Sequence, residues 1–178
     1  MCTFELNQDH TEKSLYAGAA GLNTQHLGIM VLPVEVAEAA MRCEQKENLA
    51  RVQAWLDSGG DVNDNNDDGT LLNWCTSALR IVDAHVSLAR TLIALGADVN
   101  IPENDGGTTP LHNASRGLGE APLDMVRLLL DAKANPNARC SDGGTPLKMA
   151  IEDTDDIDTT LVIVRMLLRA GASLDCAK

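Results

Sequence analysis

Apolar residues recur at helical spacing in four separate stretches of the chain. The stretches begin at Leu49, Ser87, Met125 and Val162, and each places apolar side chains at positions i, i+3 and i+4. This spacing is typical of an amphipathic helix that buries one face. The pattern therefore predicts four helices of similar character at regular intervals along the chain.

A related turn sequence follows each of these four helices. The tails read "LDSGGDVN", "IALGADVN", "LDAKANPN" and "LRAGASLD", and they end at Asn63, Asn100, Asn137 and Asp175, in steps of 37, 37 and 38 residues. A glycine ends three of the helices in the manner of a C-cap, and Lys133 stands at the equivalent place in the third. The regular steps indicate an internal repeat.

A second marker precedes a further helix in three of the four units. The heads begin at Thr70, Thr109 and Thr145, and in the last two the threonine is followed by Pro110 or Pro146. Threonine is a good N-cap, and proline is tolerated in the first helical turn because its missing N–H needs no partner there. Each unit therefore contains two helices. One such pair cannot bury its own apolar face, so the pairs are expected to stack.

Heads of the form "GTTPLHNA" and tails of the form "GADVN" resemble those of the ankyrin repeat family, over about residues 33–176. The resemblance implies an all-α fold, a solenoid of stacked helix-turn-helix pairs joined by β-hairpin-like fingers. We expect an N-terminal arm over residues 1–32, which either lies along the first pair, packs on a partner or stays mobile. The repeat domain is expected over 33–178, with repeats at 33–63, 64–100, 101–137 and 138–176.

These units are longer than the family's usual length of about 33 residues. The surplus falls between the two helices of units two to four, in "RIVDAHVS", "RGLGEAPLD" and "EDTDDIDTT". Either the helices are longer, or an extra loop projects along one edge. His112 matches the family histidine that bonds toward a neighbouring repeat, whereas Lys148 replaces it in the last unit. A solvated lysine there, with Glu35, Glu38 and Arg42 at the other end, predicts a stack closed at both ends.

Composition narrows the possible partners. Apolar residues make up 44% of the chain and aromatic residues only 2%, which suits closely packed helices. The net charge of −12 argues against a nucleic acid or an anionic membrane as ligand and permits a basic protein partner. The five cysteines are an odd number with no C-x-x-C pair, so reduced thiols in the cytoplasm, or in the nucleus, are expected.

No catalytic residue, cofactor site or metal site is predicted. Asp64, Asn66, Asp68 and Gly69 match the first half of a calcium loop, but Cys75 occupies the position of the required bidentate glutamate. The glycine-rich heads lack the spacing of a phosphate-binding loop. The pattern places His85 in a link between helices, and no nucleophile–base set is evident.

The resemblance implies a non-catalytic protein-binding module, an adaptor or regulator that uses its finger tips and inner helices. A basic or polar protein partner is favoured, and we expect a monomer when the chain is free. The alternative is a permanent structural subunit of a larger complex, which would use the N-terminal arm and the lengthened edge. The predicted contact residues are Asn66, Asp67, Trp74, Ser77, Asp105, Thr108, Arg116, Ser141, Asp142 and Glu152.

Overall fold

The structure is a computed structural model that describes residues 31–66, 69–78, 80–117, 119–152 and 156–174. Most of the predicted N-terminal arm therefore lies outside the described residues. Leu32, which was assigned to the arm, is only 2% exposed and packs in the core of the first repeat.

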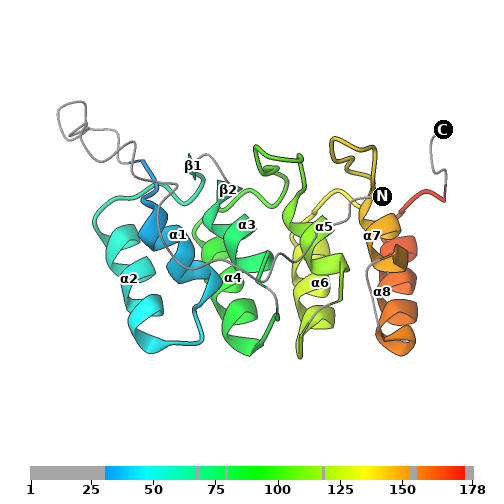
Figure 1. Cartoon of the computed structure of the whole chain (residues 1–178), viewed down its shortest axis with the longest axis horizontal. Coiled ribbons are helices and arrows are strands. Elements are labelled where there is room, and N and C mark those ends of the chain that lie inside the picture. Colours follow the sequence, from blue (N-terminus) through cyan, green and yellow to red (C-terminus); the bar gives the residue numbers. More distant parts are fainter. Residues whose placement is uncertain (1–30, 67–68, 79, 118, 153–155, 175–178) are drawn as a thin grey trace, which may run out of the picture. The chain divides into compact units, whose positions relative to one another are not determined.

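Eight helices form four consecutive pairs in the described part of the chain, as predicted (Figure 1). None of them is long and apolar enough to cross a lipid bilayer. The helices are α1 (Val34–Met41), α2 (Lys46–Asp57), α3 (Leu71–Thr76), α4 (Asp83–Ala94), α5 (Pro110–Ser115), α6 (Pro122–Asp131), α7 (Pro146–Glu152) and α8 (Ile157–Arg169).

The first helices of the pairs form an inner row, and the second helices form an outer row. Within the inner row α1 contacts α3, α3 contacts α5, and α5 contacts α7. The outer row continues from α4 to α6 and from α6 to α8. Leu72, Leu111 and Leu129 are among the fully buried side chains that make one apolar core through successive pairs. Each pair thus buries apolar surface against its neighbours, which is how a solenoid is stabilised.

Hairpin-like fingers precede the inner helices. In the first finger the strands β1 (Asn65–Asn66) and β2 (Gly69–Thr70) pair antiparallel. The second finger is closed by the Glu103 N–H, which donates to the Thr108 carbonyl at 2.8 Å. Adjacent fingers are also bonded to each other, since the Ser141 N–H donates to the Gly106 carbonyl at 2.9 Å.

The asparagines that end the tails clamp successive repeats together. The Asn63 side chain donates to the Gly96 carbonyl at 3.0 Å and accepts from the Asp98 N–H at 2.7 Å. Asn100 and Asn137 make the same two bonds to the repeats that follow them. The bonded groups lie at helix C-termini, where carbonyls lack partners within the helix. One side chain thus satisfies the end of the next outer helix.

The lengthened links of repeats two and three pair with each other. The N–H groups of Glu120 and Ala121 both donate to the Ile81 carbonyl, at 2.8 and 3.0 Å, and Arg80 forms an ion pair with Glu120 at 2.9 Å. Ile81 is 1% exposed. Part of the surplus sequence also lies in α4, which begins at Asp83. Longer helices do not account for the surplus in repeat two, since α4 and α2 both have 12 residues, and the links that contain the extra residues are bonded to each other.

The prediction that the stack is closed at both ends is wrong at the fourth repeat. Lys148 is half-buried, as predicted for a lysine in an end repeat, but it is a single residue on the exposed side of this repeat. Ile151, Leu161 and Leu168 remain exposed on α7 and α8, because no following pair lies against them in the described residues.

Lys133 holds the left-handed conformation that glycine holds in the other repeats. Its φ is 69°, and Gly59, Gly96 and Gly171 have φ values of 96°, 97° and 94° at the same place. This conformation costs a side-chain-bearing residue ~1–2 kcal/mol, and glycine loses ~0.5–1 kcal/mol more backbone entropy on folding. We therefore expect Lys133→Gly to raise the free energy of unfolding by ~0.5–1 kcal/mol in urea titrations. Lys133→Ala is the control, since alanine still carries a Cβ atom and keeps the strain of the left-handed conformation. A glycine variant no more stable than the alanine variant would contradict this account.

Gly119 is required by the pairing of the two links. Its φ is +107°, and an added Cβ would lie 2.3 Å from the backbone nitrogen and oxygen of Ile81. Gly119→Ala should therefore lower the free energy of unfolding by about 2 kcal/mol or more, through strain and lost hydrogen bonds. Gly143→Ala is the matched control, because Gly143 has φ +74° and open space around it. Equal losses in the two variants would show that only backbone conformation matters.

Candidate protein-binding surface

The inner helices share one position that faces away from the core. In each of α1, α3 and α5, one residue that is not buried is flanked by two buried residues on each side. These residues are Glu38, Trp74 and Asn113. The pattern arises because each helix packs against neighbours on both sides and against its own outer partner, which leaves one narrow face free. Met149 occupies this position in α7. The four side chains form a row across the repeats, which we call the inner row surface.

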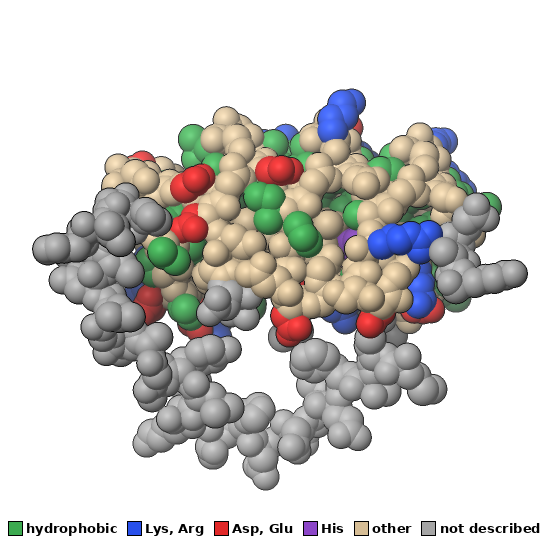
Figure 2. All heavy atoms as spheres, turned by 90° about the horizontal axis from the view of Figure 1, so that it is seen from above, with side chains coloured by type: hydrophobic (Ala, Val, Ile, Leu, Met, Phe, Trp, Pro, Cys, Tyr) green, Lys and Arg blue, Asp and Glu red, His purple; other side chains and the backbone are tan. Residues whose placement is uncertain are grey.

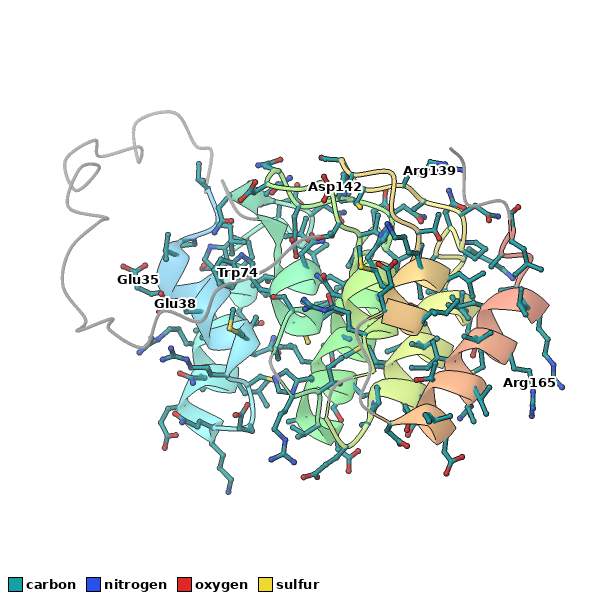
Figure 3. All side chains as sticks on the ribbon, turned by 45° about the vertical axis from the view of Figure 1, so that its right-hand side comes forward. Glu35, Glu38, Trp74, Arg139, Asp142 and Arg165 are labelled. Atoms are coloured by element: carbon teal, nitrogen blue, oxygen red, sulfur yellow. The ribbon has the colours of Figure 1, made fainter. Side chains whose placement is uncertain are left out.

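The fingers add exposed polar side chains beside the inner row surface. Asp105, Ser141 and Asp142 are exposed, as predicted, whereas Asp67 lies outside the described residues. Figure 3 shows Asp142 on its finger, above the helices, and Glu35, Glu38 and Trp74 projecting from the first two repeats.

Two predicted finger contacts need correction. Asn66 is not exposed: its side-chain oxygen accepts from the Gly69 N–H at 3.1 Å and from the Trp74 indole N–H at 3.4 Å. An asparagine at this turn stabilises the backbone with its own amide, so it turns inward. Thr108 is half-buried, and its hydroxyl donates to Glu103 at 2.6 Å.

Trp74 itself is half-buried and packs partly on the core. Its side chain therefore has an exposed edge with a fixed orientation, because the indole N–H is held by Asn66. A rigid aromatic edge of this kind is a suitable contact for a partner protein.

The predicted helix positions lie at the ends of the inner helices. Ser77 is exposed and its hydroxyl donates to the Trp74 carbonyl at 3.2 Å. Arg116 is exposed at the end of α5. Glu152 lies 3.9 Å from Lys148 and lines, with Asp142, a cavity of about 330 Å³ at the fourth repeat. The nine predicted residues that the structure describes are thus spread over three repeats and do not converge on one point.

Glu103 was missed as a candidate contact. Its two carboxylate oxygens accept from Thr108 in the finger at 2.6 Å and from Asn113 in α5 at 2.7 Å. The carboxylate is therefore fixed between finger and helix, and next to the inner row surface. The repeat pattern in the sequence gave no reason to single out Glu103, because the head of the third repeat begins at Thr109, six residues later.

Exposed charges of both signs occur along the repeats. On the first three repeats Glu35, Glu38 and Asp105 are exposed, as is Arg116, whereas on the fourth Arg139 and Arg165 are exposed together with Asp142 and Glu152. Figure 2 shows acidic side chains over the left part of the upper face and basic side chains toward the right end. The acidic part of the inner surface thus coincides with Trp74.

The two buried histidines join repeats. His112 Nδ1 accepts from the Thr109 N–H at 3.1 Å, so Nε2 carries the proton and donates to the Gly144 carbonyl at 3.2 Å. This confirms the predicted bond to the following repeat. His85 makes the corresponding pair of bonds, to the Val82 N–H at 3.2 Å and the Met41 carbonyl at 2.9 Å.

His85 corrects the sequence prediction, which placed it in a link between helices. The ring caps the first turn of α4 and lies near Cys43 and Cys75 at the junction of the first two repeats. The Cys75 thiol donates to the His85 carbonyl at 3.2 Å. Interaction with Cys75, and to a lesser extent with His85, lowers the pKa of Cys43 to about 6, although burial opposes the change. All three side chains are buried, so the cluster is closed to a substrate in this conformation.

The family comparison agrees with the fold. The model of ankyrin repeats (3 copies) matches residues 37–140 and also residues 81–177. The chain belongs to the ankyrin repeat family, whose repeats are generally protein–protein interaction modules and are typically non-catalytic. No curated protein matches the chain. Among the described residues, no group of three or more His, Cys, Asp or Glu side chains is placed to hold a metal ion.

Because His112 is buried, the stability of the folded chain depends on pH. Burial lowers the pKa of His112, despite the bond to Gly144. The unfolded state therefore binds a proton near pH 6.5 that the folded state does not, and stability falls as the pH drops below that value. The slope is at most about 1.4 kcal/mol per pH unit for one group.

His112→Asn is the test, because Asn73 fills the equivalent place and donates to the Ile101 carbonyl. The free energy of unfolding of the parent should fall more steeply than that of the variant between pH 7 and pH 5, in urea titrations at each pH. Parallel curves would mean that His112 has the same pKa in the folded and unfolded states, which would contradict this account.

Proposed function

We propose that the chain is an adaptor or regulator that captures a basic segment of a partner protein along the first three repeats. The observation that carries this proposal is the coincidence of several carboxylates, of which Glu103 is held by two hydrogen bonds, with the exposed aromatic edge of Trp74 on and beside the inner row surface. Glu38 and Trp74 stand in equivalent positions of neighbouring helices, and Glu103 and Asp105 follow in the next finger.

The chemistry of these groups selects the partner. A lysine or arginine side chain is attracted by the carboxylates and also by the face of an indole ring. Isolated exposed ion pairs contribute little, so the affinity has to come from several contacts made at once along an extended segment. An acidic partner would meet like charge at each of these positions.

The stack holds the surface in place before binding. The fingers are bonded to each other, and Glu103 and Trp74 are each held by neighbouring polar groups. Little side-chain entropy is therefore lost on binding, which favours affinity. We place this interaction in the cytoplasm, where the cysteines stay reduced.

The permanent-subunit alternative relies on the N-terminal arm, most of which lies outside the described residues, and on the lengthened links as a binding edge. In repeats two and three these links are occupied by bonds to each other. This observation favours the inner surface over the links as the place of partner contact.

Charge reversal on the inner surface is the test. The 178-residue chain and its variant Glu38→Lys with Asp105→Lys are used for quantitative affinity capture from the native cells. We expect the variant to lose partner recovery at least tenfold, and recovery by the parent to fall at raised salt, because exposed charges are screened.

The matched control is Asp57→Lys with Asp131→Lys. These two aspartates are exposed at equivalent ends of the outer helices α2 and α6, and the change in net charge is the same. The control variant should recover the same proteins as the parent, and all three chains should melt at similar temperatures. Equal recovery by the inner-surface variant and the control would reject the proposed surface.

A further inference from the structure

The outermost helix of the fourth repeat carries an apolar stripe toward solvent. Ile157, Leu161, Val164 and Leu168 follow one another at spacings of four, three and four residues, which places them along one face of α8. Leu161 is 54% exposed and Leu168 40% exposed. Together with Val164, Arg165 and Arg169 they line a shallow groove on this helix. Val164 packs partly against the core, whereas Ile157, Leu161 and Leu168 are exposed in the described part of the chain.

The preceding repeats show what such a stripe does. Leu123 and Leu130 of α6 stand 38 residues before Leu161 and Leu168, the step that relates the tails of these two repeats. Both leucines of α6 are partly buried and belong to the packed core, because α8 lies beside α6. Ile151 of α7 gives the same comparison. Ser115 occupies the equivalent place in α5 and is fully buried, whereas Ile151 is 62% exposed. The outer side of α7 and α8 is therefore a stacking face, which we call the end face.

On each helix of the end face, the charged side chains at the two ends of the helix have opposite signs. On α8, Asp158 lies in the first turn, and Arg165 and Arg169 lie toward the C-terminus. On α7 the order is Lys148 and then Glu152, one turn later. Figure 3 shows Arg165 projecting at the outer end of the fourth repeat. A helix of this kind is complementary to itself when two copies run antiparallel.

We propose that the end face binds the end face of a second copy of this chain, which gives a two-fold symmetric dimer. The symmetry axis crosses α8 between Leu161 and Val164, so that the two α8 helices run antiparallel and α7 faces α7. The apolar stripes then pack on each other, as in a two-stranded helical interface. Asp158 of each copy faces Arg165 of the other, and Lys148 faces Glu152 in the same way.

The charge pattern favours a second copy over another helix pair that simply continues the stack. A helix pair that continued the stack would run in the same direction as α7 and α8, and its sequence could be complementary to any arrangement of charges. Such a pair therefore gives no reason for charges of opposite sign at the two ends of α7 and of α8. A two-fold interface contains each pair twice, and the surface has to be complementary to itself. Each copy carries a net charge of −12, so the association also requires such pairs to offset the mutual repulsion.

Sedimentation equilibrium of the full 178-residue chain, over a range of micromolar concentrations, tests the proposal. The parent should show a reversible monomer–dimer equilibrium. Leu161→Glu with Leu168→Glu should weaken the dimer at least tenfold, because both side chains are exposed and the change places four carboxylates in the interface. Leu95→Glu is the control: Leu95 is also 54% exposed but lies at the end of α4, and this variant should dimerise like the parent.

A charge exchange tests the antiparallel orientation. Asp158→Arg alone and Arg165→Asp alone should each weaken self-association, since each places like charges opposite one another. An equimolar mixture of the two variants should form a heterodimer about as well as the parent forms a homodimer, because every pair is then of opposite sign. Circular dichroism melts confirm that the variants are folded.

A parent chain that stays monomeric at all concentrations overturns the proposal. A dimer that resists the Leu161 and Leu168 changes, or one that Leu95→Glu disrupts to the same extent, places the interface elsewhere and also overturns it. A dimer that depends on the leucines while the mixed charge variants fail to associate overturns the two-fold antiparallel arrangement.

Discussion

The structure depends on the inability of one helix pair to bury its own apolar face. Each inner helix is short, six to eight residues, which is too short to be stable alone in water. Contact with the pairs on both sides supplies the missing burial, and one core runs through all four repeats. The consequence is that the stack has internal faces, which are satisfied by neighbours, and end faces, which are not.

Polar side chains set the register of this stacking. Asn63, Asn100 and Asn137 each bond to the C-terminal end of the next outer helix, and His112 bonds to the next finger. Their partners are backbone groups that would otherwise lack a bond, so a displaced neighbour leaves several of them unsatisfied. The apolar core therefore provides most of the burial, while these side chains determine which arrangement of the pairs is adopted.

The same geometry separates two surfaces with different properties. The inner row surface carries Glu38 and Trp74 and lies beside the carboxylates of Glu103 and Asp105, which suits a basic partner. The end face is apolar and has charges of both signs, which suits a second copy of itself. The two surfaces share few residues, so partner capture and self-association can occur together in one molecule.

Spacing and local backbone chemistry were enough to predict the four repeats, their helices, the capping side chains of Thr70 and Thr145 and the cap position of Lys133. The tertiary structure alone decided which polar groups face inward. Asn66 is buried by its own turn, His85 caps a helix that begins earlier than the pattern suggested, and Ile81 pairs with Gly119 about 40 residues away. Such contacts depend on how successive repeats are placed, and helical spacing records only which face of each helix is apolar. For the same reason Leu123 and Leu161 look alike in the sequence, and only the stack shows that one is covered and the other exposed.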